Sequence, residues 1–197
     1  MRSSQIRNFV LADRDGVINQ RIVGGYVTSW EKFVFLPGAL DALRLLTAKD
    51  YHVIVVSNQA GVGKGLMTAV DLQEITRRFV DEVDAQGGRI QAVYYCTHQA
   101  GDDCPCRKPK PGLLLKAQAE HHFIFEDTFL IGDSESDLLA AHAVGCPTIM
   151  VSNAAPGHLE KLPHAPQMIV PSLLAAATFL VSLETHGPSI SQVDSTL

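Results

Sequence analysis

The sequence predicts an α/β fold, a doubly wound parallel sheet with helices on both faces. Short, continuously apolar runs rich in β-branched residues recur along the chain, and such runs are typical of parallel strands buried on both faces. Stretches with an apolar stripe at helical spacing separate these runs, so that strand and helix alternate. Acidic and polar residues directly follow several runs, as expected at the carboxyl edge of open α/β sheets, where ligands bind.

The predicted strands are the apolar runs themselves. Phe9–Ala12 leads into a glycine turn, and Val53–Val56 is an uninterrupted β-branched run. The same reasoning applies to later runs bounded by turn residues. The predicted strands span, in order, residues 7–12, 53–56, 92–95, 128–131, 148–151 and a short 168–170.

The predicted helices begin and end at recognisable residues. Thr68 and Asp71 have the spacing of a capping box, and Gly87-Gly88 ends the helix that follows them. Gly145 ends a later helix in the same way. The predicted helices span residues 36–49, 68–86, 111–121, 134–144 and 172–184, and residues 19–36 include a longer irregular connection.

The composition is that of a mildly acidic globular protein. The net charge of −5 argues against a nucleic-acid partner, because binding a phosphate backbone needs a basic surface. No stretch of 18 or more apolar residues is present, so no membrane association is expected. Met1–Ile6 lacks the features of a secretory signal, which predicts a cytoplasmic location. We expect a monomer with one domain, residues 1–184, and a disordered tail, residues 185–197.

Two carboxylates follow the first predicted strand. Asp13 and Asp15 are separated by one residue, so they leave the sheet close together and repel each other unless a cation or a shared proton intervenes. Mg²⁺ is suited to this place, because it binds carboxylate, carbonyl and phosphate oxygens together. The pair therefore predicts phosphoryl transfer, with Asp13 attacking phosphorus and Asp15 handling the proton of the leaving alcohol. The alternative is a solvated turn.

Polar and basic residues follow two further strands. Ser57 and Asn58 end the second strand before a glycine-rich segment, a combination that suits a backbone bending around an anion. Arg107 and Lys108 follow the third strand and the cysteine segment, and they supply the cations that a phosphate site needs. The alternatives are a flexible loop in the first case and a solvated basic run in the second.

A second pair of acids follows the fourth predicted strand. Asp133 ends that strand, and Asp137 lies one helical turn further on, facing the same way. We interpret the two as the second half of a Mg²⁺ site. The alternative role for either residue is helix capping.

Three of the four cysteines lie close together in the sequence. Cys96, His98, Cys104 and Cys106 together match a closed tetrahedral site for structural Zn²⁺. A redox dithiol and chance clustering are the alternatives. Cys146 stands apart and is interpreted as a small buried apolar residue.

Four of these segments resemble, in order, the motifs of the haloacid dehalogenase superfamily of phosphotransferases, over about residues 7–152. The resemblance implies a Rossmann-like doubly wound sheet with no large cap domain, and a zinc-stabilised loop that partly encloses the site. The segments that carry it are Asp13-Arg14-Asp15-Gly16, Ser57-Asn58-Gln59, residues 107–112, and Gly132-Asp133 followed by Asp137.

The resemblance also implies roles for individual residues. Asp13 would form an aspartyl-phosphate, and Asp15 would be the general acid and base. Mg²⁺ would be held by Asp13, the carbonyl of Asp15 and Asp133, with Asp137 assisting. The implied phosphate-binding residues are Ser57, Asn58, Gln59 and Lys108, of which Lys108 is also catalytic, and the residues implied to meet the rest of the substrate are Arg107, Gly25 and Tyr26.

The cysteine insertion is similar to the branch that holds the heptose-bisphosphate phosphatases and the histidinol-phosphate phosphatase domain. Residues 13–19, 25–27 and 58–61 resemble the heptose enzymes more closely, which implies hydrolysis of the 7-phosphate of D-glycero-D-manno-heptose 1,7-bisphosphate, a small phosphorylated sugar on the route to lipopolysaccharide core. The five-residue spacer between His98 and Cys104 resembles the histidinol-phosphate branch, so that substrate stays open. A catalytically silent, zinc-stabilised binding module is the third hypothesis.

Overall fold

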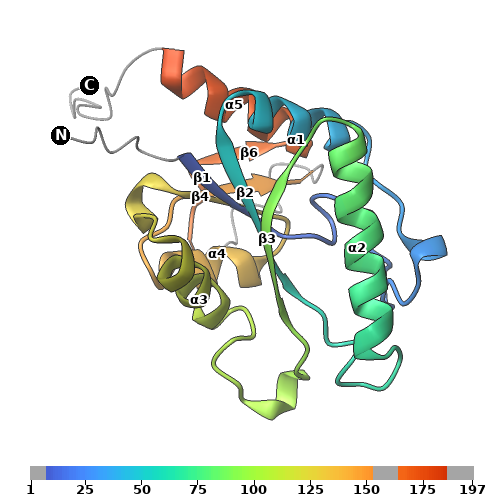
Figure 1. Ribbon diagram of the computed structural model, residues 1–197. Coiled ribbons are helices and arrows are strands. Elements are labelled where there is room, and N and C mark those ends of the chain that lie inside the picture. Colours follow the sequence, from blue (N-terminus) through green and yellow to red (C-terminus); the bar gives the residue numbers. More distant parts are fainter. Residues whose placement is uncertain (1–7, 153–163, 186–197) are drawn as a thin grey trace.

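The computed structural model describes residues 8–152 and 164–185, which form a parallel sheet between two layers of helices (Figure 1). The strand order is β3-β2-β1-β4-β5-β6, and every neighbouring pair is parallel. This confirms the predicted doubly wound α/β fold. The strands of the described chain are β1 (Asn8–Ala12), β2 (Tyr51–Asn58), β3 (Ile90–Cys96), β4 (Phe129–Gly132), β5 (Thr148–Val151) and β6 (Met168–Val170).

The helices alternate with the strands as predicted. In the ranges that the structure describes, the α-helices are α1 (Ala39–Ala48), α2 (Ala69–Ala85), α3 (Gly112–His121), α4 (Glu135–His142) and α5 (Leu173–Thr185). Short 3₁₀ turns occur at η1 (Trp30–Lys32), η2 (Ala100–Asp102) and η3 (Phe125–Asp127). None of the described helices is both long enough and apolar enough to cross a bilayer.

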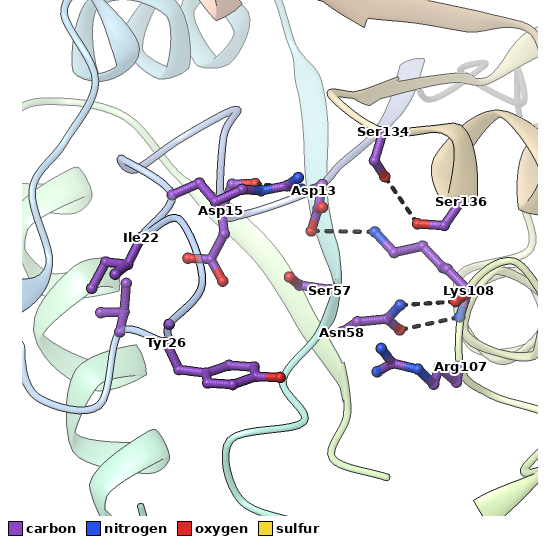
Figure 2. A pocket seen from close by; sticks show the side chains of 13 residues that line it. Asp13, Asp15, Ile22, Tyr26, Ser57, Asn58, Arg107, Lys108, Ser134 and Ser136 are labelled. Atoms are coloured by element: carbon purple, nitrogen blue, oxygen red, sulfur yellow. Dashed lines mark hydrogen bonds and ion pairs between the residues drawn. The ribbon is translucent and has the colours of Figure 1, made fainter. Parts of the chain in front are cut away.

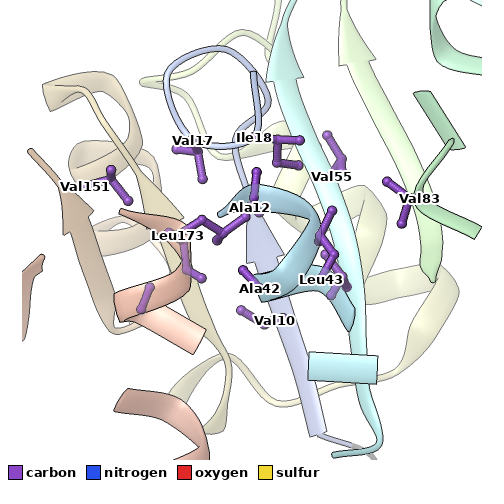
Figure 3. Close-up of a cluster of buried hydrophobic side chains, with 14 of the residues drawn as sticks. Val10, Ala12, Val17, Ile18, Ala42, Leu43, Val55, Val83, Val151 and Leu173 are labelled. Carbon is purple, nitrogen blue, oxygen red and sulfur yellow. The ribbon is translucent and has the colours of Figure 1, made fainter. Parts of the chain in front are cut away.

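The central strand β1 separates two apolar cores. Val10 and Ala12 pack into the core beneath α1, α2 and α5, part of which Figure 3 shows. Phe9 and Leu11 point the other way, into the core beneath α3 and α4. Because all four side chains are buried, each contributes roughly 1–3 kcal/mol of transfer free energy, less for the alanine. The whole strand is therefore held firmly between the layers, and its carboxyl end has a fixed position.

Local sequence signals explain where α2 begins and how it packs. The hydroxyl of Thr68 accepts a hydrogen bond from the backbone of Asp71, and the carboxylate of Asp71 accepts one from the backbone of Thr68. This confirms the predicted capping box. The buried face of α2 has the predicted spacing and consists of Leu72, Ile75, Phe79 and Val83.

Some element boundaries differ from the prediction. β2 extends to Asn58 because it pairs with β3 as far as Cys96, so polar residues also belong to the strand. The helix predicted over residues 134–144 is the shorter α4, because Ser134 is its N-cap and a turn ending at Gly145 follows it. α5 continues through Thr185, and the tail predicted beyond it lies outside the described residues.

Candidate active site

The carboxyl ends of β1, β2 and β4 lie side by side and carry the side chains of the candidate site (Figure 1). Above this edge is a cavity of about 330 Å³. Acidic, basic and hydroxyl side chains converge on it from several elements (Figure 2). The lining residues are Asp13, Asp15, Arg21, Ile22, Gly25, Tyr26, Val27, Ser57, Asn58, Arg107, Lys108, Ser134 and Ser136.

Asp13 lies at the point where β1 enters the cavity. Its backbone N–H donates to the carbonyl of Ile131 at 2.9 Å, which continues the pairing of β1 with β4 by one residue. Its carboxylate accepts the backbone N–H of Arg14 at 2.7 Å and lies 3.2 Å from Lys108 Nζ. Burial raises the pKa of Asp13, while the charge of Lys108 opposes that shift.

Lys108 is a buried cation between two acids. Its Nζ lies 2.5 Å from Asp137 Oδ1 and 2.8 Å from the carbonyl oxygen of Val56 on β2, in addition to its contact with Asp13. Burial opposes the charge of Lys108, but attraction to Asp13 and Asp137 outweighs it and raises the pKa of the ammonium group. Lys108 therefore stays protonated beside Asp13.

Asn58 positions the backbone of Lys108. Its side-chain amide donates to the Lys108 carbonyl at 2.9 Å, and its side-chain oxygen accepts the Lys108 N–H at 3.1 Å (Figure 2). This pair of bonds joins the end of β2 to the segment after β3. Asn58 lies on the cavity wall, a position that suits its predicted role in phosphate binding. Its side chain also holds the backbone of Lys108 in place.

Asp137 has both of its oxygens engaged. Oδ1 pairs with Lys108, and Oδ2 accepts the backbone N–H of Ser134 at 3.2 Å and its hydroxyl at 2.6 Å, which closes the capping box of α4. The structure thus confirms the capping role considered for Asp137, and it shows that the same carboxylate also holds Lys108.

Asp133 directly follows β4 and faces the turn after β1. Gly16 approaches it so closely that a Cβ on Gly16, whose φ is +95°, would overlap Asp133 Oδ2. Arg21 Nη2 lies 2.6 Å from Asp133 Oδ1 and 3.4 Å from the carbonyl oxygen of Asp15. Burial raises the pKa of Asp133 to about 7, and the charge of Arg21 opposes that shift.

These oxygens fit a divalent cation. One carboxylate oxygen each from Asp13, Asp133 and Asp137 lie within 4.8 Å of one another. The guanidinium of Arg21 spans an oxygen of Asp133 and the carbonyl of Asp15, so that a cation already lies against these two oxygens. An all-oxygen donor set of this kind suits Mg²⁺.

Asp15 lies on the wall of the cavity with donors on both of its oxygens. Asn19 Nδ2 donates to Oδ1 at 2.8 Å, and Gln59 Nε2 donates to Oδ2 at 2.7 Å. Arg14 Nη2 donates to both oxygens, at 2.9 and 3.0 Å. The carboxylate is thus held from its protein side while it remains part of the cavity lining.

Gln59 is placed differently from the expectation. It is buried behind the cavity, where its amide donates to Asp15 and to the Ser57 hydroxyl, and its oxygen accepts from Arg14. A direct role in phosphate binding does not fit this position. Gln59 instead holds Asp15. Of the glycines that follow, Gly61 packs against Tyr26 and Gly63 against the backbone of Thr97, while Gly65 faces open space.

The outer wall of the cavity is formed by residues from two separate loops. Gly25 and Tyr26 lie on one side, as the resemblance implies, and Arg107 lies near Tyr26 in Figure 2. Arg107 Nη1 donates to the carbonyl of His98 at 3.3 Å, which ties it to the cysteine segment. The mouth of the cavity is therefore more basic than its floor, which carries the acids.

The predicted zinc ligands converge. Cys106 Sγ lies 3.3 Å from Cys96 Sγ, 3.4 Å from Cys104 Sγ and 3.3 Å from His98 Nδ1. Zinc–sulfur bonds of about 2.3 Å in a tetrahedron give a sulfur–sulfur separation of ~3.7 Å, so the cluster has nearly the size that zinc requires. Cys146 is buried in the core, and its thiol donates to the carbonyl of Thr128, as expected for a packing residue.

Sequence reasoning missed three residues that contact the acids. Arg14 stands between Asp13 and Asp15 in the motif, so its position could have drawn attention to it. Asn19 lies four residues after Asp15 and returns to it through the turn. Arg21 lies in the irregular connection, where no pattern in the sequence indicates its direction.

Comparison with known proteins places these features in a family. A family model described as HAD-hydrolase-like matches residues 105–176. A D-glycero-alpha-D-manno-heptose-1,7-bisphosphate 7-phosphatase of Mycobacterium tuberculosis is 41% identical over 155 residues, covering 74% of this chain and 80% of the relative. A D-glycero-beta-D-manno-heptose-1,7-bisphosphate 7-phosphatase of Pseudomonas putida is 37% identical over 174 residues, covering 87% of this chain and 98% of the relative.

A solved structure agrees with these relatives. The crystal structure of a D,D-heptose 1,7-bisphosphate phosphatase from B. bronchiseptica, complexed with magnesium and phosphate, is similar to this chain with a TM-score of 0.83. The sequences are 30% identical, and the match covers 89% of this chain and 98% of that one. The similarity therefore extends over most of both chains.

Proposed function

Because the chain belongs to the HAD-like hydrolase family of phosphatases, we propose that it removes the 7-phosphate from D-glycero-D-manno-heptose 1,7-bisphosphate in a magnesium-dependent reaction. The observation that carries the proposal is the buried contact of Lys108 with Asp13 at the floor of the cavity. A cation fixed beside a carboxylate stabilises the charge of a phosphoryl group that the carboxylate attacks.

In the first half of the proposed reaction, a carboxylate oxygen of Asp13 forms a bond to phosphorus while the bond from phosphorus to the sugar oxygen breaks. Asp15 gives its proton to that leaving oxygen. The product on the protein is an aspartyl-phosphate at Asp13. Lys108 and the hydroxyl of Ser57 lie beside Asp13 on the cavity wall, where they can contact the transferring phosphoryl group.

In the second half, Asp15 takes a proton from a water molecule whose oxygen attacks phosphorus. The bond between phosphorus and Asp13 breaks, and inorganic phosphate leaves. Asp13, Asp133 and the carbonyl of Asp15 would hold Mg²⁺, which when bound neutralises charge on the phosphoryl oxygens. Asp137 would act indirectly, because it holds the ammonium group of Lys108 in place.

A structural zinc on Cys96, His98, Cys104 and Cys106 is part of the proposal. The four ligand atoms lie within 4.8 Å of one another, and Arg107 and Lys108 follow Cys106 directly. Zinc would therefore fix the start of the segment that delivers both basic residues to the cavity.

The basic mouth of the cavity supports a substrate with a second phosphate. Arg107 lines the cavity in addition to Lys108, and its guanidinium donates to a backbone carbonyl, whereas Lys108 and Arg21 pair with acids, so its charge is available for a second phosphate. The relative from Mycobacterium tuberculosis is named for the alpha anomer of the heptose and the relative from Pseudomonas putida for the beta anomer. Comparison of kcat/KM for the two anomers would identify the preferred one. A cytoplasmic location and a monomeric state also belong to the proposal.

A substrate panel tests the function. We expect kcat/KM for heptose 1,7-bisphosphate to exceed that for histidinol phosphate and for simple phosphomonoesters, and we expect activity to disappear when Mg²⁺ is chelated. Preference for histidinol phosphate would favour the alternative suggested by the short cysteine spacer. Absence of Mg²⁺-dependent phosphate release over the whole panel would favour a binding module instead.

A further inference from the structure

Arg14 is the most deeply buried charged side chain of the site, with none of its surface exposed. Burial of an unpaired guanidinium costs several kcal/mol, so its partners decide whether the fold tolerates it. Its Nε and Nη2 donate to Asp15, and Nη2 also donates to Gln59 Oε1 at 3.0 Å. The guanidinium lies between the rings of Phe33 and Tyr95, with centroids 5.8 and 5.6 Å away. These contacts give it a single orientation.

Arg14 contacts Asp13 through its backbone and Asp15 through its side chain. Its backbone N–H donates to Asp13 Oδ1 at 2.7 Å, while its side chain holds Asp15. Its carbonyl accepts the N–H groups of Ile18 and Asn19, which closes the turn that returns Asn19 to Asp15. One residue therefore contacts both carboxylates.

We propose that Arg14 is a positioning residue that acts through Asp15, with Gln59 as its partner. This inference rests on the proposed function. The forked N–H groups of Arg14 and the amide of Gln59 hold both oxygens of Asp15 from the protein side, leaving the carboxyl group, 22% exposed, to face the leaving oxygen in the cavity. Proton transfer depends steeply on such placement, because donor and acceptor must come within hydrogen-bond reach.

The role predicts a loss that depends on the leaving group. A sugar or alkyl oxygen leaves poorly unless Asp15 protonates it, whereas p-nitrophenolate leaves without a proton. Arg14→Lys keeps the charge but loses the fork that matches a carboxylate. We expect kcat/KM for a primary alkyl phosphate to fall about a hundredfold, within the range of general-acid catalysis, and kcat/KM for p-nitrophenyl phosphate to fall less than about threefold. The ratio kcat/KM is the quantity to compare, because it reports the steps up to departure of the leaving group and not the later hydrolysis at Asp13, which is common to both substrates.

Two further measurements separate positioning from general damage. In an Asp15→Asn background, Arg14→Lys should have no further effect on either substrate, because its target is already inactive. Arg44→Lys is the control for loss of an arginine: this residue lies on α1, pairs with Asp41 and is not among the residues that line the cavity, so the variant should leave kcat/KM for both substrates unchanged.

A second variant addresses folding. Gln59→Met preserves the size of the side chain and leaves the buried charge in place, while removing its bonds to Asp15 and Arg14. It should show the same preference for p-nitrophenyl phosphate, with about a tenfold loss on the alkyl phosphate. If Arg14→Lys does not fold, this variant carries the test alone.

Equal losses of kcat/KM for the two substrates would overturn the positioning role while leaving the phosphatase function intact. A further loss of kcat/KM when Arg14→Lys is added to Asp15→Asn would do the same. A wild-type enzyme that released phosphate from neither substrate would instead remove the proposed function, and this inference with it. The two failures are therefore distinguishable.

Discussion

At the scale of single residues, the site depends on how closely the turn after β1 approaches the end of β4. Gly16 has a positive φ, and its missing Cβ leaves room for the carboxylate of Asp133. Among the described glycines with a positive φ, Gly16 is the one at which a Cβ would overlap a carboxylate. The position of a proposed metal-binding oxygen therefore depends on the absence of one carbon atom.

Replacing Gly16 by alanine tests this dependence. Gly16→Ala should displace Asp133 and lower kcat/KM about a hundredfold, because misplacement of a catalytic group by about 1 Å costs that much. Gly24→Ala is the matched control, since Gly24 also has a positive φ but would place its Cβ in open space. Steady-state kinetics with thermal melts would decide. Similar activities in two variants with similar melting temperatures would contradict the account.

Sequence reasoning located most of the side chains on the cavity wall but not all of their roles. Asp13 and Asp133 follow β1 and β4, and Ser57 lies near the end of β2; this grouping could be predicted from the positions of the apolar runs. Gln59 lies behind the cavity, where its side chain accepts a hydrogen bond from Arg14. Asp137 pairs with Lys108, which is 29 residues away in the chain. Such pairings follow from tertiary packing, which local patterns do not encode.

At the scale of elements, Lys108 is held in place by three parts of the chain. These are the end of β2, the first turn of α4 and the cysteine segment that precedes Lys108. The carbonyl of Val56 and the side chain of Asn58 come from β2, and Asp137 comes from α4. The ammonium group thus lies where the two halves of the sheet meet. Its charge can serve Asp13 only while these elements keep their positions.

Asp137→Asn should weaken the hold on Lys108 while an amide oxygen still caps α4. A charge-assisted hydrogen bond contributes about 1.5–3 kcal/mol, so we expect kcat to fall roughly tenfold to a hundredfold. Asp71→Asn is the matched control, because Asp71 occupies the same capping-box position in α2, away from the cavity. Its stability should fall slightly, with kcat unchanged. A kcat for Asp137→Asn equal to that of the control would exclude the role.

The cysteine segment predicts a coupling between zinc and stability. Cys104→Ser should lower the zinc content and the melting temperature, because a zinc site contributes folding free energy to a loop with little core of its own. Cys146→Ser is the control, since Cys146 is buried elsewhere and lies outside the cluster. Metal analysis and calorimetry on both variants would decide. Undiminished zinc in Cys104→Ser would refute the site.

At the scale of the whole molecule, the fold brings residues from distant parts of the chain to one edge. The order β3-β2-β1-β4-β5-β6 places β1 between β2 and β4, so the proposed nucleophile, the proposed phosphate-binding residues and the second pair of acids lie at the ends of adjacent strands. The alternation of strand and helix predicts the parallel, doubly wound arrangement, whereas the order of the strands follows from tertiary packing. The shape and basic mouth of the cavity could not be predicted, because they depend on loops without periodic patterns.

The central claim is that Asp13 itself carries the phosphoryl group during turnover. The most direct measurement is acid quenching of the enzyme during hydrolysis of a phosphomonoester radiolabelled in its phosphoryl group, followed by peptide mapping. The account predicts label on Asp13 in the wild-type enzyme, and no label and no turnover in a folded Asp13→Asn variant. Label on a different residue, or turnover at the wild-type rate in Asp13→Asn, would contradict it.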